Sequence, residues 1–129
     1  MSKFSLLILC AGFGKRMLDL TTNTPKPLLK IKNNILLENT INFFSDIGCN
    51  EIFINTHYLS HKIEIFINNK FSKYPVNIIY EPSLLGTGGG IKNIFNYTTN
   101  TNICVVNSDI FWQKNNNSDV LNFLADYDN

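Results

Sequence analysis

The sequence of 129 residues predicts an α/β fold, in which a mostly parallel β-sheet is covered by helices. Short, continuously apolar runs alternate with longer segments whose apolar residues recur at helical spacing. The short runs lack polar residues at every second position, which indicates strands buried on both faces. Alternating strands and helices of this kind build right-handed βαβ units on one sheet. The length corresponds to one domain or part of one, and the 44% of hydrophobic and 16% of charged residues exclude intrinsic disorder.

Four strands are expected from the short apolar runs, because polar or glycine-rich sequence follows each of them. These strands are residues 4–10, 51–55, 76–80 and 103–107. Glycines and basic residues follow the first run at once, so we interpret it as a buried strand rather than as a signal peptide. No apolar run approaches the roughly 18 residues that a membrane-spanning helix needs.

Four helices are expected between and after the strands, at residues 36–47, 60–71, 88–97 and 119–127. In the first helix, Leu37, Ile41 and Phe44 share one face, and Gly48 is placed to end it. Ser60 is a candidate N-cap of the second helix, which carries an apolar stripe. The third helix begins with glycines.

The segment at residues 11–27 is expected to be a functional loop. It is too long for an ordinary connection between two elements, and structureless loops of this length are usually functional. It begins at the carboxyl end of the first strand, and ligands of parallel sheets collect at the carboxyl ends of the strands. The candidate binding residues of the sequence lie at those ends.

Gly12, Gly14 and Arg16 form a Gly-x-Gly-x-Arg pattern directly after the first strand. Glycines let backbone N–H groups approach a phosphate, which a guanidinium can bind through two parallel hydrogen bonds. The pattern is not a P-loop, which would need Gly in place of Leu9 and Ser or Thr in place of Arg16. A dinucleotide-binding fingerprint would need Gly in place of Met17. A bare turn would explain the two glycines equally well.

Two further loops carry candidate binding residues. Lys26 stands between Pro25 and Pro27, which fix the backbone on both sides and would aim its ammonium group. Between Glu81 and Gly90 the sequence has four glycines in five residues, which is unfavourable unless something lies against the backbone. The alternatives are a rigid exposed turn around Lys26 and a flexible glycine linker, the second disfavoured by the apolar residues beside it.

Asp109 follows the fourth strand and is the candidate metal ligand. Mg²⁺ needs only one or two protein carboxylates where phosphates fill its other positions. The alternative is an aspartate that caps the next turn. His57 follows the second strand, and we interpret it as a loop residue with an ordinary hydrogen bond. No Ser-His-Asp or Cys-His arrangement for covalent catalysis is readable.

Charge and cysteine content exclude several classes of partner. The net charge of +1, from 11 basic and 10 acidic residues, is not the footprint of a protein that binds nucleic acid or an anionic membrane. Cys10, Cys49 and Cys104 have no metal-ligand spacing and are odd in number, so a reduced, cytoplasmic protein is expected. Cys10 and Cys104 lie within strands and are expected to be packing residues.

Five collinear segments resemble the amino-terminal part of sugar-phosphate nucleotidyltransferases, above all N-acetylmuramate-1-phosphate uridylyltransferases and mannose-1-phosphate guanylyltransferases. They are residues 9–17 (Leu-Cys-Ala-Gly-Phe-Gly-Lys-Arg-Met), 24–28 (Thr-Pro-Lys-Pro-Leu), 55–59 (Asn-Thr-His-Tyr-Leu), 85–91 (Leu-Gly-Thr-Gly-Gly-Gly-Ile) and 106–109 (Val-Asn-Ser-Asp). The sequence departs from the family at Cys10, where a small Ala is usual, and at Asp19, where Pro is common. The resemblance implies a Rossmann-like, three-layer αβα fold with a mostly parallel sheet, the nucleotide-diphospho-sugar transferase fold, here truncated.

The resemblance implies an enzyme that joins a nucleoside triphosphate to a sugar 1-phosphate, with Mg²⁺, to give a nucleotide sugar and pyrophosphate. The attacking phosphate oxygen is already anionic, so this chemistry demands positioning and charge neutralisation rather than a general base. The resemblance gives catalytic roles to Arg16 and Lys26 and makes Asp109 the metal ligand. The implied nucleotide-binding residues are Ala11, Gly12, Gly14, Arg16, Glu81, Gly88 and Gly89, with Gly90 close by.

Members of the family are longer, and their second half supplies most of the sugar pocket. We therefore expect residues 1–129 to be the nucleotide-binding part, with the carboxy-terminal sugar-binding part missing. A complementing carboxy-terminal fragment or self-association would then be expected. A non-catalytic nucleotide-binding remnant and one half of a split enzyme are alternatives, and Met17 disfavours an NAD-dependent oxidoreductase. The sequence does not distinguish UTP from GTP or one sugar phosphate from another.

Overall fold

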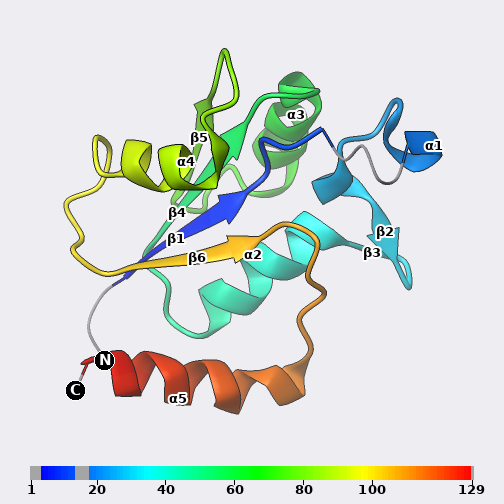
Figure 1. Cartoon of the computed structure of the whole chain (residues 1–129). Coiled ribbons are helices and arrows are strands. Elements are labelled where there is room, and N and C mark those ends of the chain that lie inside the picture. The colour runs from blue at the N-terminus through cyan, green and yellow to red at the C-terminus, as the bar shows by residue number, and fades with distance from the viewer. Residues whose placement is uncertain (1–3, 14–17, 129) are drawn as a thin grey trace.

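The computed structural model describes residues 4–13 and 18–128, and its centre is a four-stranded parallel sheet (Figure 1). The strands are β1 (Ser5–Leu9), β4 (Glu51–Thr56), β5 (Val76–Tyr80) and β6 (Ile103–Asn107). They lie in the order β5-β4-β1-β6, and every neighbouring pair is parallel. All four expected strands are confirmed, and their carboxyl ends lie along one edge of the sheet.

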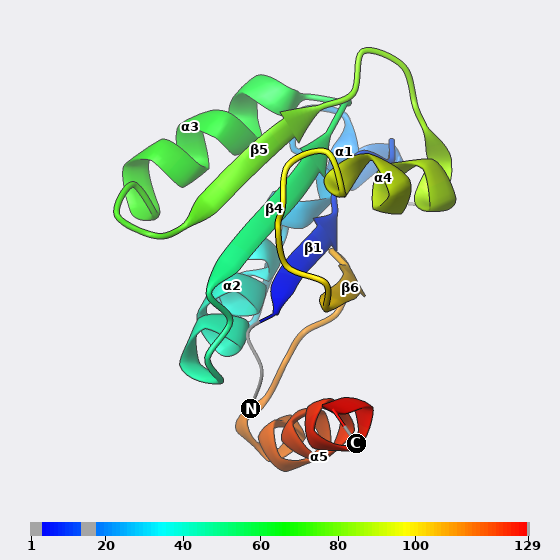
Figure 2. The ribbon, with the colours of Figure 1, turned by 90° about the vertical axis from the view of Figure 1, so that its left-hand side faces the viewer.

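Helices cover both faces of this sheet, as expected for a three-layer fold (Figure 2). In the described part of the chain, α2 (Leu36–Asp46), α3 (Ser60–Lys70) and α5 (Asn117–Asp128) pack on one face. The helix α4 (Gly86–Ile94) packs on the opposite face. None of the helices in the described ranges is long and apolar enough to cross a bilayer.

The apolar strands fill two layers of core, because alternate residues of a strand point to opposite faces. Leu6 of β1 lies opposite Ile52 of β4, and both are fully buried under α2 and α3. Leu7 and its partner Phe53 point the other way, toward Ile94 of α4. Full burial of one such side chain contributes about 1.5–3 kcal/mol, so burial on both faces explains why the strands are continuously apolar.

Helix α2 ends just before Gly48, as the sequence predicted. Gly48 has a φ of +98°, and its N–H donates to the carbonyl of Ser45. The N–H of Cys49 donates to the carbonyl of Phe44. These two bonds form a Schellman motif, which satisfies the last carbonyl groups of the helix and reverses the chain toward β4.

Helix α3 does not begin as predicted, because Ser60 is not its N-cap. The N-cap is Leu59, whose φ is +52°, and Ser60 is already the first helical residue. The Ser60 hydroxyl is hydrogen-bonded instead to the Thr56 hydroxyl, with 2.7 Å between the oxygens. The side chain therefore joins the helix to the end of β4 rather than to the first helical N–H groups.

Two other helices begin earlier than expected. Helix α4 starts at Gly86 instead of residue 88 and ends at Ile94 instead of residue 97. Helix α5 starts at Asn117 instead of residue 119, directly after the 3-10 helix η3 (Lys114–Asn116). These shifts leave the order of strands and helices unchanged.

The segment expected to be one long loop has structure of its own. It contains the short helix α1 (Leu18–Thr21) and leads into the 3-10 helix η2 (Lys26–Leu28). A two-stranded hairpin follows, made of β2 (Lys30–Ile31) and β3 (Asn34–Ile35), which the sequence did not predict. Its two turn residues both have positive φ angles, as the twist of a two-residue hairpin requires.

Candidate functional site

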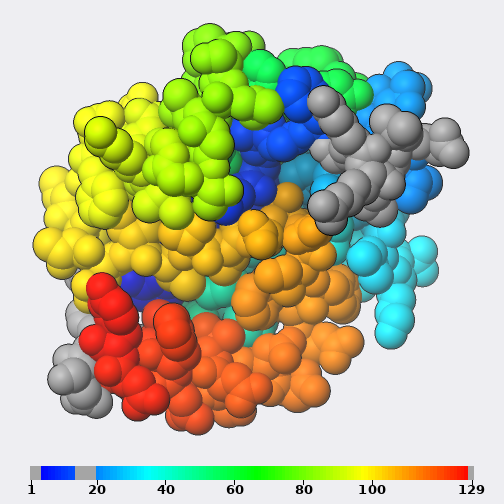
Figure 3. Space-filling model, in the orientation of Figure 1, coloured from blue at the N-terminus to red at the C-terminus, as the bar shows by residue number. Residues whose placement is uncertain are grey.

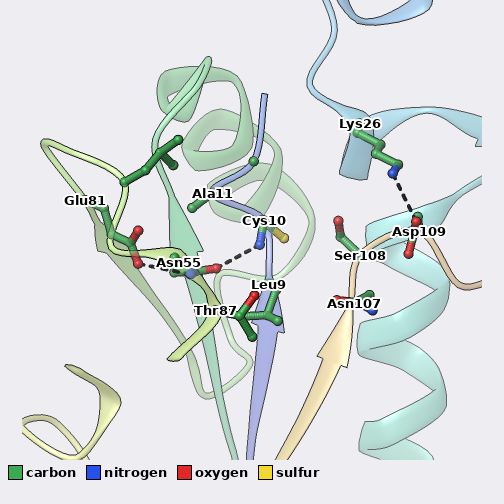
Figure 4. A pocket seen from close by; sticks show the side chains of 13 residues that line it. Leu9, Cys10, Ala11, Lys26, Asn55, Glu81, Thr87, Asn107, Ser108 and Asp109 are labelled. Atoms are coloured by element: carbon green, nitrogen blue, oxygen red, sulfur yellow. Dashed lines mark hydrogen bonds and ion pairs between the residues drawn. The ribbon is translucent and has the colours of Figure 1, made fainter. Parts of the chain in front are cut away.

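A cavity of about 410 Å³ opens at the carboxyl edge of the sheet, where Figure 3 shows a hollow over the end of β1. Strands β1, β4 and β6 contribute to it, Glu81 enters from directly after β5, and Lys26 enters from η2 (Figure 4). The lining residues are Leu9, Cys10, Ala11, Gly12, Lys26, Asn55, Glu81, Leu84, Gly86, Thr87, Asn107, Ser108 and Asp109. The cavity thus lies where parallel sheets place their ligands.

Five of the residues singled out in the sequence meet in this cavity, namely Ala11, Gly12, Lys26, Glu81 and Asp109. Two others, Gly14 and Arg16, lie outside the described residues, so the structure gives no position for them. Gly88 and Gly89 do not line the cavity, and their neighbours Gly86 and Thr87 do.

Lys26 and Asp109 form an ion pair on one side of the cavity (Figure 4). Lys26 Nζ lies 3.0 Å from Asp109 Oδ2, and the two side chains are 29% and 45% exposed. Pro25 is the N-cap of η2, and its carbonyl accepts a hydrogen bond from the N–H of Leu28. The Lys26 side chain thus reaches the cavity from a backbone that is flanked by prolines on both sides.

A buried polar network occupies the other side of the cavity and consists of Cys10, Asn55, Glu81 and Leu85. Asn55 accepts a hydrogen bond from the Cys10 N–H (2.8 Å) and donates one to Glu81 Oε2 (3.0 Å). The N–H of Leu85 donates to Glu81 Oε1 (3.2 Å). Sequence reasoning gave Asn55 no role, although a polar residue near the end of an otherwise apolar, buried strand was the available signal.

His57 behaves as the sequence predicted. Its Nδ1 lies 2.7 Å from the carbonyl oxygen of Glu81, which is an ordinary loop hydrogen bond. Its ring contacts those of Phe13 and Tyr80, with centroid distances of 5.2 and 6.4 Å.

Tyr58 connects the same loop to the end of α1. Its hydroxyl lies 2.8 Å from the carbonyl oxygen of Thr21 and 3.0 Å from that of Thr22, and donates to these groups.

The glycines around the cavity have different reasons to be glycine. A Cβ atom added at Gly12 or Gly88 would meet nothing within 4 Å, so protein packing does not require glycine there. A Cβ atom at Gly89 would lie 2.8 Å from Leu85 Cβ. At Gly90 it would lie 2.9 Å from Asn55 Nδ2 and 3.4 Å from Glu81 Oε2. Only the first two positions leave the backbone open to an incoming group.

Cys10 lines the cavity but is not a candidate nucleophile. Burial raises the pKa of its thiol far above the ordinary value, and a hydrogen bond with Ser108 lowers it by less. A neutral, buried thiol is inert, because the thiolate is the reactive form. The prediction that Cys10 is a packing residue is confirmed by its 2% exposure, while Cys104 is only partly buried.

The cavity fits a divalent cation that brings ligands of its own. Asp109 offers a carboxylate, and oxygen-bearing Asn107 and Ser108 line the same wall. Within residues 4–13 and 18–128 no group of three or more His, Cys, Asp or Glu could hold a metal. This donor set suits Mg²⁺ bound largely by phosphates and water, and it does not suit a site built from protein ligands alone.

A parallel sheet with open glycines, a lysine and an aspartate at its carboxyl edge defines an α/β protein suited to phosphorylated ligands. The chain belongs to the nucleotidyl transferase family, whose model matches residues 5–129. This confirms the family resemblance read from the sequence.

Two curated relatives illustrate the family. The chain is 37% identical over 107 residues to the N-acetylmuramate alpha-1-phosphate uridylyltransferase of Neisseria meningitidis, covering 81% of this chain and 46% of that protein. It is 32% identical over 103 residues to the D-glycero-alpha-D-manno-heptose 1-phosphate guanylyltransferase of Aneurinibacillus thermoaerophilus, covering 80% of this chain and 45% of that protein. The chain therefore spans about half the length of these two curated relatives.

Solved structures confirm the fold. The chain superposes on UDP-glucose pyrophosphorylase complexed with UDP-glucose with a TM-score of 0.79 at 19% identity, covering 98% of this chain and 55% of that one. For the CTP:phosphocholine cytidylyltransferase of Streptococcus pneumoniae the TM-score is 0.71 at 26% identity, covering 84% of this chain and 46% of that one. The three-layer αβα arrangement with a parallel sheet is that of these transferases.

Proposed function

We propose that residues 1–129 form the nucleotide-binding part of an enzyme that joins a nucleoside triphosphate to a sugar 1-phosphate. One observation carries the proposal: a single cavity brings the Lys26 ammonium and the Asp109 carboxylate together beside the backbone of Ala11 and Gly12. The curated relatives, named as uridylyl- and guanylyltransferases of sugar 1-phosphates, support it.

In the proposed reaction a phosphate oxygen of the sugar 1-phosphate forms a bond to the α-phosphorus, and the bond to the β-phosphate breaks. The displaced group leaves as pyrophosphate, so no oxidant or reductant is needed. Lys26 would neutralise phosphate charge next to the reacting atoms, and Gly12 would let backbone N–H groups approach the triphosphate. Gly14 and Arg16 are proposed as further phosphate-binding residues on the sequence alone.

Asp109 would hold Mg²⁺, with Asn107 and Ser108 beside it. The bound ion would supply charge neutralisation on the phosphate oxygens. Because Asp109 Oδ2 is paired with Lys26, the ammonium must turn from the carboxylate toward the phosphates when the substrate binds. Glu81, Gly88 and Gly89 are proposed on the nucleoside side of the site.

We place this reaction in the cytoplasm, which the three unpaired cysteines support. The sugar phosphate would need residues beyond the half-length spanned here, so a complementing carboxy-terminal fragment or self-association is proposed as well. Size-exclusion chromatography of the pure chain tests self-association, and a clean, stable monomer would count against it.

Calorimetric titration with Mg·GTP and Mg·UTP tests the nucleotide site, with NAD as the comparison ligand. Pyrophosphate release after adding mannose 1-phosphate or N-acetylmuramate 1-phosphate tests the transfer. We expect binding of at least one triphosphate, with a dependence on Mg²⁺ that is lost in Asp109→Asn and kept in the matched control Asp126→Asn, whose side chain is exposed on α5. Binding without turnover would favour a nucleotide-binding half or remnant, and preferential NAD binding would refute the proposal.

A further inference from the structure

The buried polar network joins the two loops that enclose the nucleoside side of the cavity. We infer that Glu81 and Asn55 are positioning residues, which hold the glycine segment after β5 against the end of β1 and act on the nucleotide only through those loops. The identity of the ligand in this inference rests on the proposed function, whereas the hydrogen-bond network does not. Under this inference the Glu81 carboxylate makes no direct contact with the nucleotide.

Every polar group of Glu81 already has a partner in the protein. Its N–H donates to the carbonyl of Thr56 (2.7 Å), and its own carbonyl lies 2.7 Å from His57 Nδ1. Its two carboxylate oxygens accept from Leu85 N–H (3.2 Å) and from Asn55 Nδ2 (3.0 Å). A residue held at two backbone groups and at both carboxylate oxygens is fixed in place before any ligand arrives.

Burial shows that this arrangement is costly to disturb. Glu81 is 2% exposed and Asn55 is 4% exposed. No ion pair forms on Glu81 within the described part of the chain, where the two salt bridges involve other residues. A buried carboxylate without a cation depends on its hydrogen-bond donors, so the loss of one donor strongly favours rearrangement of the loop.

Asn55 is the link between the two loops (Figure 4). Its Oδ1 accepts from the Cys10 N–H directly after β1, and its Nδ2 donates to Glu81 directly after β5. Ala11 and Gly12 follow Cys10, and Gly86 and Thr87 follow Leu85, and all four line the cavity. One amide side chain therefore sets the spacing between two walls of the site.

The glycine run supports the same inference. Gly90 sits against the network, where an added Cβ atom would lie 2.9 Å from Asn55 Nδ2. Because Asn55 is buried and bonded at both ends, it cannot move aside without losing a hydrogen bond. Glycine at this position is thus explained by the Asn55–Glu81 pair rather than by a ligand.

An exchange of the two functional groups tests the inference. In Glu81→Gln an N–H₂ group must face either the Asn55 amide or the Leu85 N–H, so one donor opposes another. In Asn55→Asp two carboxylates face each other. In the double variant Asn55→Asp/Glu81→Gln, the carboxylate at position 55 accepts one hydrogen bond from the Cys10 N–H and another from the side-chain amide at position 81. The carbonyl oxygen of that amide accepts from the Leu85 N–H. Every bond of the network is then restored with one polarity reversed.

Three measurements are made on each variant: thermal unfolding, hydrogen exchange of the Cys10 and Leu85 amides, and affinity for Mg·GTP and Mg·UTP. We expect each single variant to lose protection at both amides and to bind the triphosphate about tenfold more weakly, and the double variant to regain both. Gly90→Ala should act in the same direction, since it displaces the Asn55 amide without removing a group, and Gly88→Ala is the matched control for folding.

The outcomes separate the alternatives. Recovery of amide protection without recovery of affinity in the double variant would mean that the Glu81 carboxylate touches the nucleotide, and would overturn the inference. Lost protection with unchanged affinity in the single variants would mean a purely structural role, and would also overturn it. If the single variants do not fold, the double variant alone tests the inference. An affinity equal to that of the unmodified protein supports it, and a weaker affinity overturns it. If the unmodified protein binds neither triphosphate, the proposed function fails, while the protection pattern still tests the network.

Discussion

Replacement of Lys26 by methionine should have opposite effects on two ligands of the same site. Lys26 Nζ lies 3.0 Å from Asp109 Oδ2, so the ammonium and a divalent cation compete for one carboxylate. Without the ammonium, Asp109 is free for the cation. Binding of a triphosphate should become weaker, because a positive charge that would neutralise its phosphates is lost.

The exposure of the pair sets the size of the first effect. The two side chains are 29% and 45% exposed, and an ion pair in such surroundings contributes about 0.2–1 kcal/mol. Release of the carboxylate should therefore tighten binding of the free cation by between about 1.4-fold and fivefold. Removal of the neighbouring positive charge acts in the same direction. The same weak coupling means that Lys26→Met should fold normally.

Titration with Mn²⁺ alone, followed by electron paramagnetic resonance, measures the effect without a nucleotide. The matched control is Lys70→Met, which removes a lysine whose Nζ lies 3.3 Å from Glu38 Oε1 in another exposed pair. The reasoning is wrong if Lys26→Met binds Mn²⁺ no more tightly than the unmodified protein. It is also wrong if Lys70→Met shows the same change, since net charge alone would then explain it.

Three further predictions concern stability and binding. Gly88→Ala should keep or raise the melting temperature and weaken triphosphate binding, because the added Cβ atom meets no neighbour within the protein. Gly90→Ala should lower the melting temperature, because its Cβ atom meets the Asn55 amide. Equal melting temperatures of the two variants would contradict this prediction. Tyr58→Phe removes the hydroxyl that bonds two carbonyls at the end of α1, and should lower the free energy of unfolding in urea by about 0.5–1.5 kcal/mol; no loss would show that these bonds do not hold the loop. Burial raises the pKa of the Cys49 thiol from 9.0 to about 11, so between pH 9 and pH 11 the unfolded state loses the proton before the folded state does, and the folded state becomes less stable as the pH rises. The melting temperature of Cys49→Ala should therefore fall less over this pH range than that of the unmodified protein. Parallel curves of melting temperature against pH would show that the Cys49 pKa is not raised.

The sheet could be predicted from the sequence because burial on both faces leaves a direct trace. Leu6 and Leu7 point to opposite layers, so both had to be apolar, and the same holds along each strand. The end of α2 was predictable for a similar reason, since Gly48 adopts a φ that other residues avoid. Strand burial and a helix-ending φ angle each restrict the residue types at single positions, so both can be predicted from the sequence.

Features set by an unusual backbone turn could not be read in this way. Ser60 has the chemistry of an N-cap, but the left-handed Leu59 takes that position, and the Ser60 hydroxyl is bonded to Thr56, four residues earlier at the end of β4. The short hairpin β2–β3 has no apolar run long enough to be predicted as two strands. Its Asn33, which has a φ of +66°, was the one available signal.

The glycine segment shows how one pattern can hide several causes. The sequence predicted that this backbone lies against a ligand. The structure gives Gly86 a φ of +73°, places Leu85 Cβ 2.8 Å from where a Cβ atom of Gly89 would be, and places Asn55 against Gly90. Only Gly88 is left without an internal reason. The positions of loops at the site were predictable, but the division between ligand-facing and packing residues was not.

The contact between Lys26 and Asp109 joins positions 83 residues apart. A ligand that binds both groups acts as a noncovalent cross-link around a loop that includes β4, α3 and β5. The unfolded chain cannot hold the two ends together, so the ligand binds the native state alone and stabilises it by about 2.7 kcal/mol at a hundred times its Kd. Its presence should therefore slow proteolysis in the buried strand β4, which opens only when the whole chain unfolds, and leave cleavage at the exposed turn around Ser72 and Lys73 unchanged.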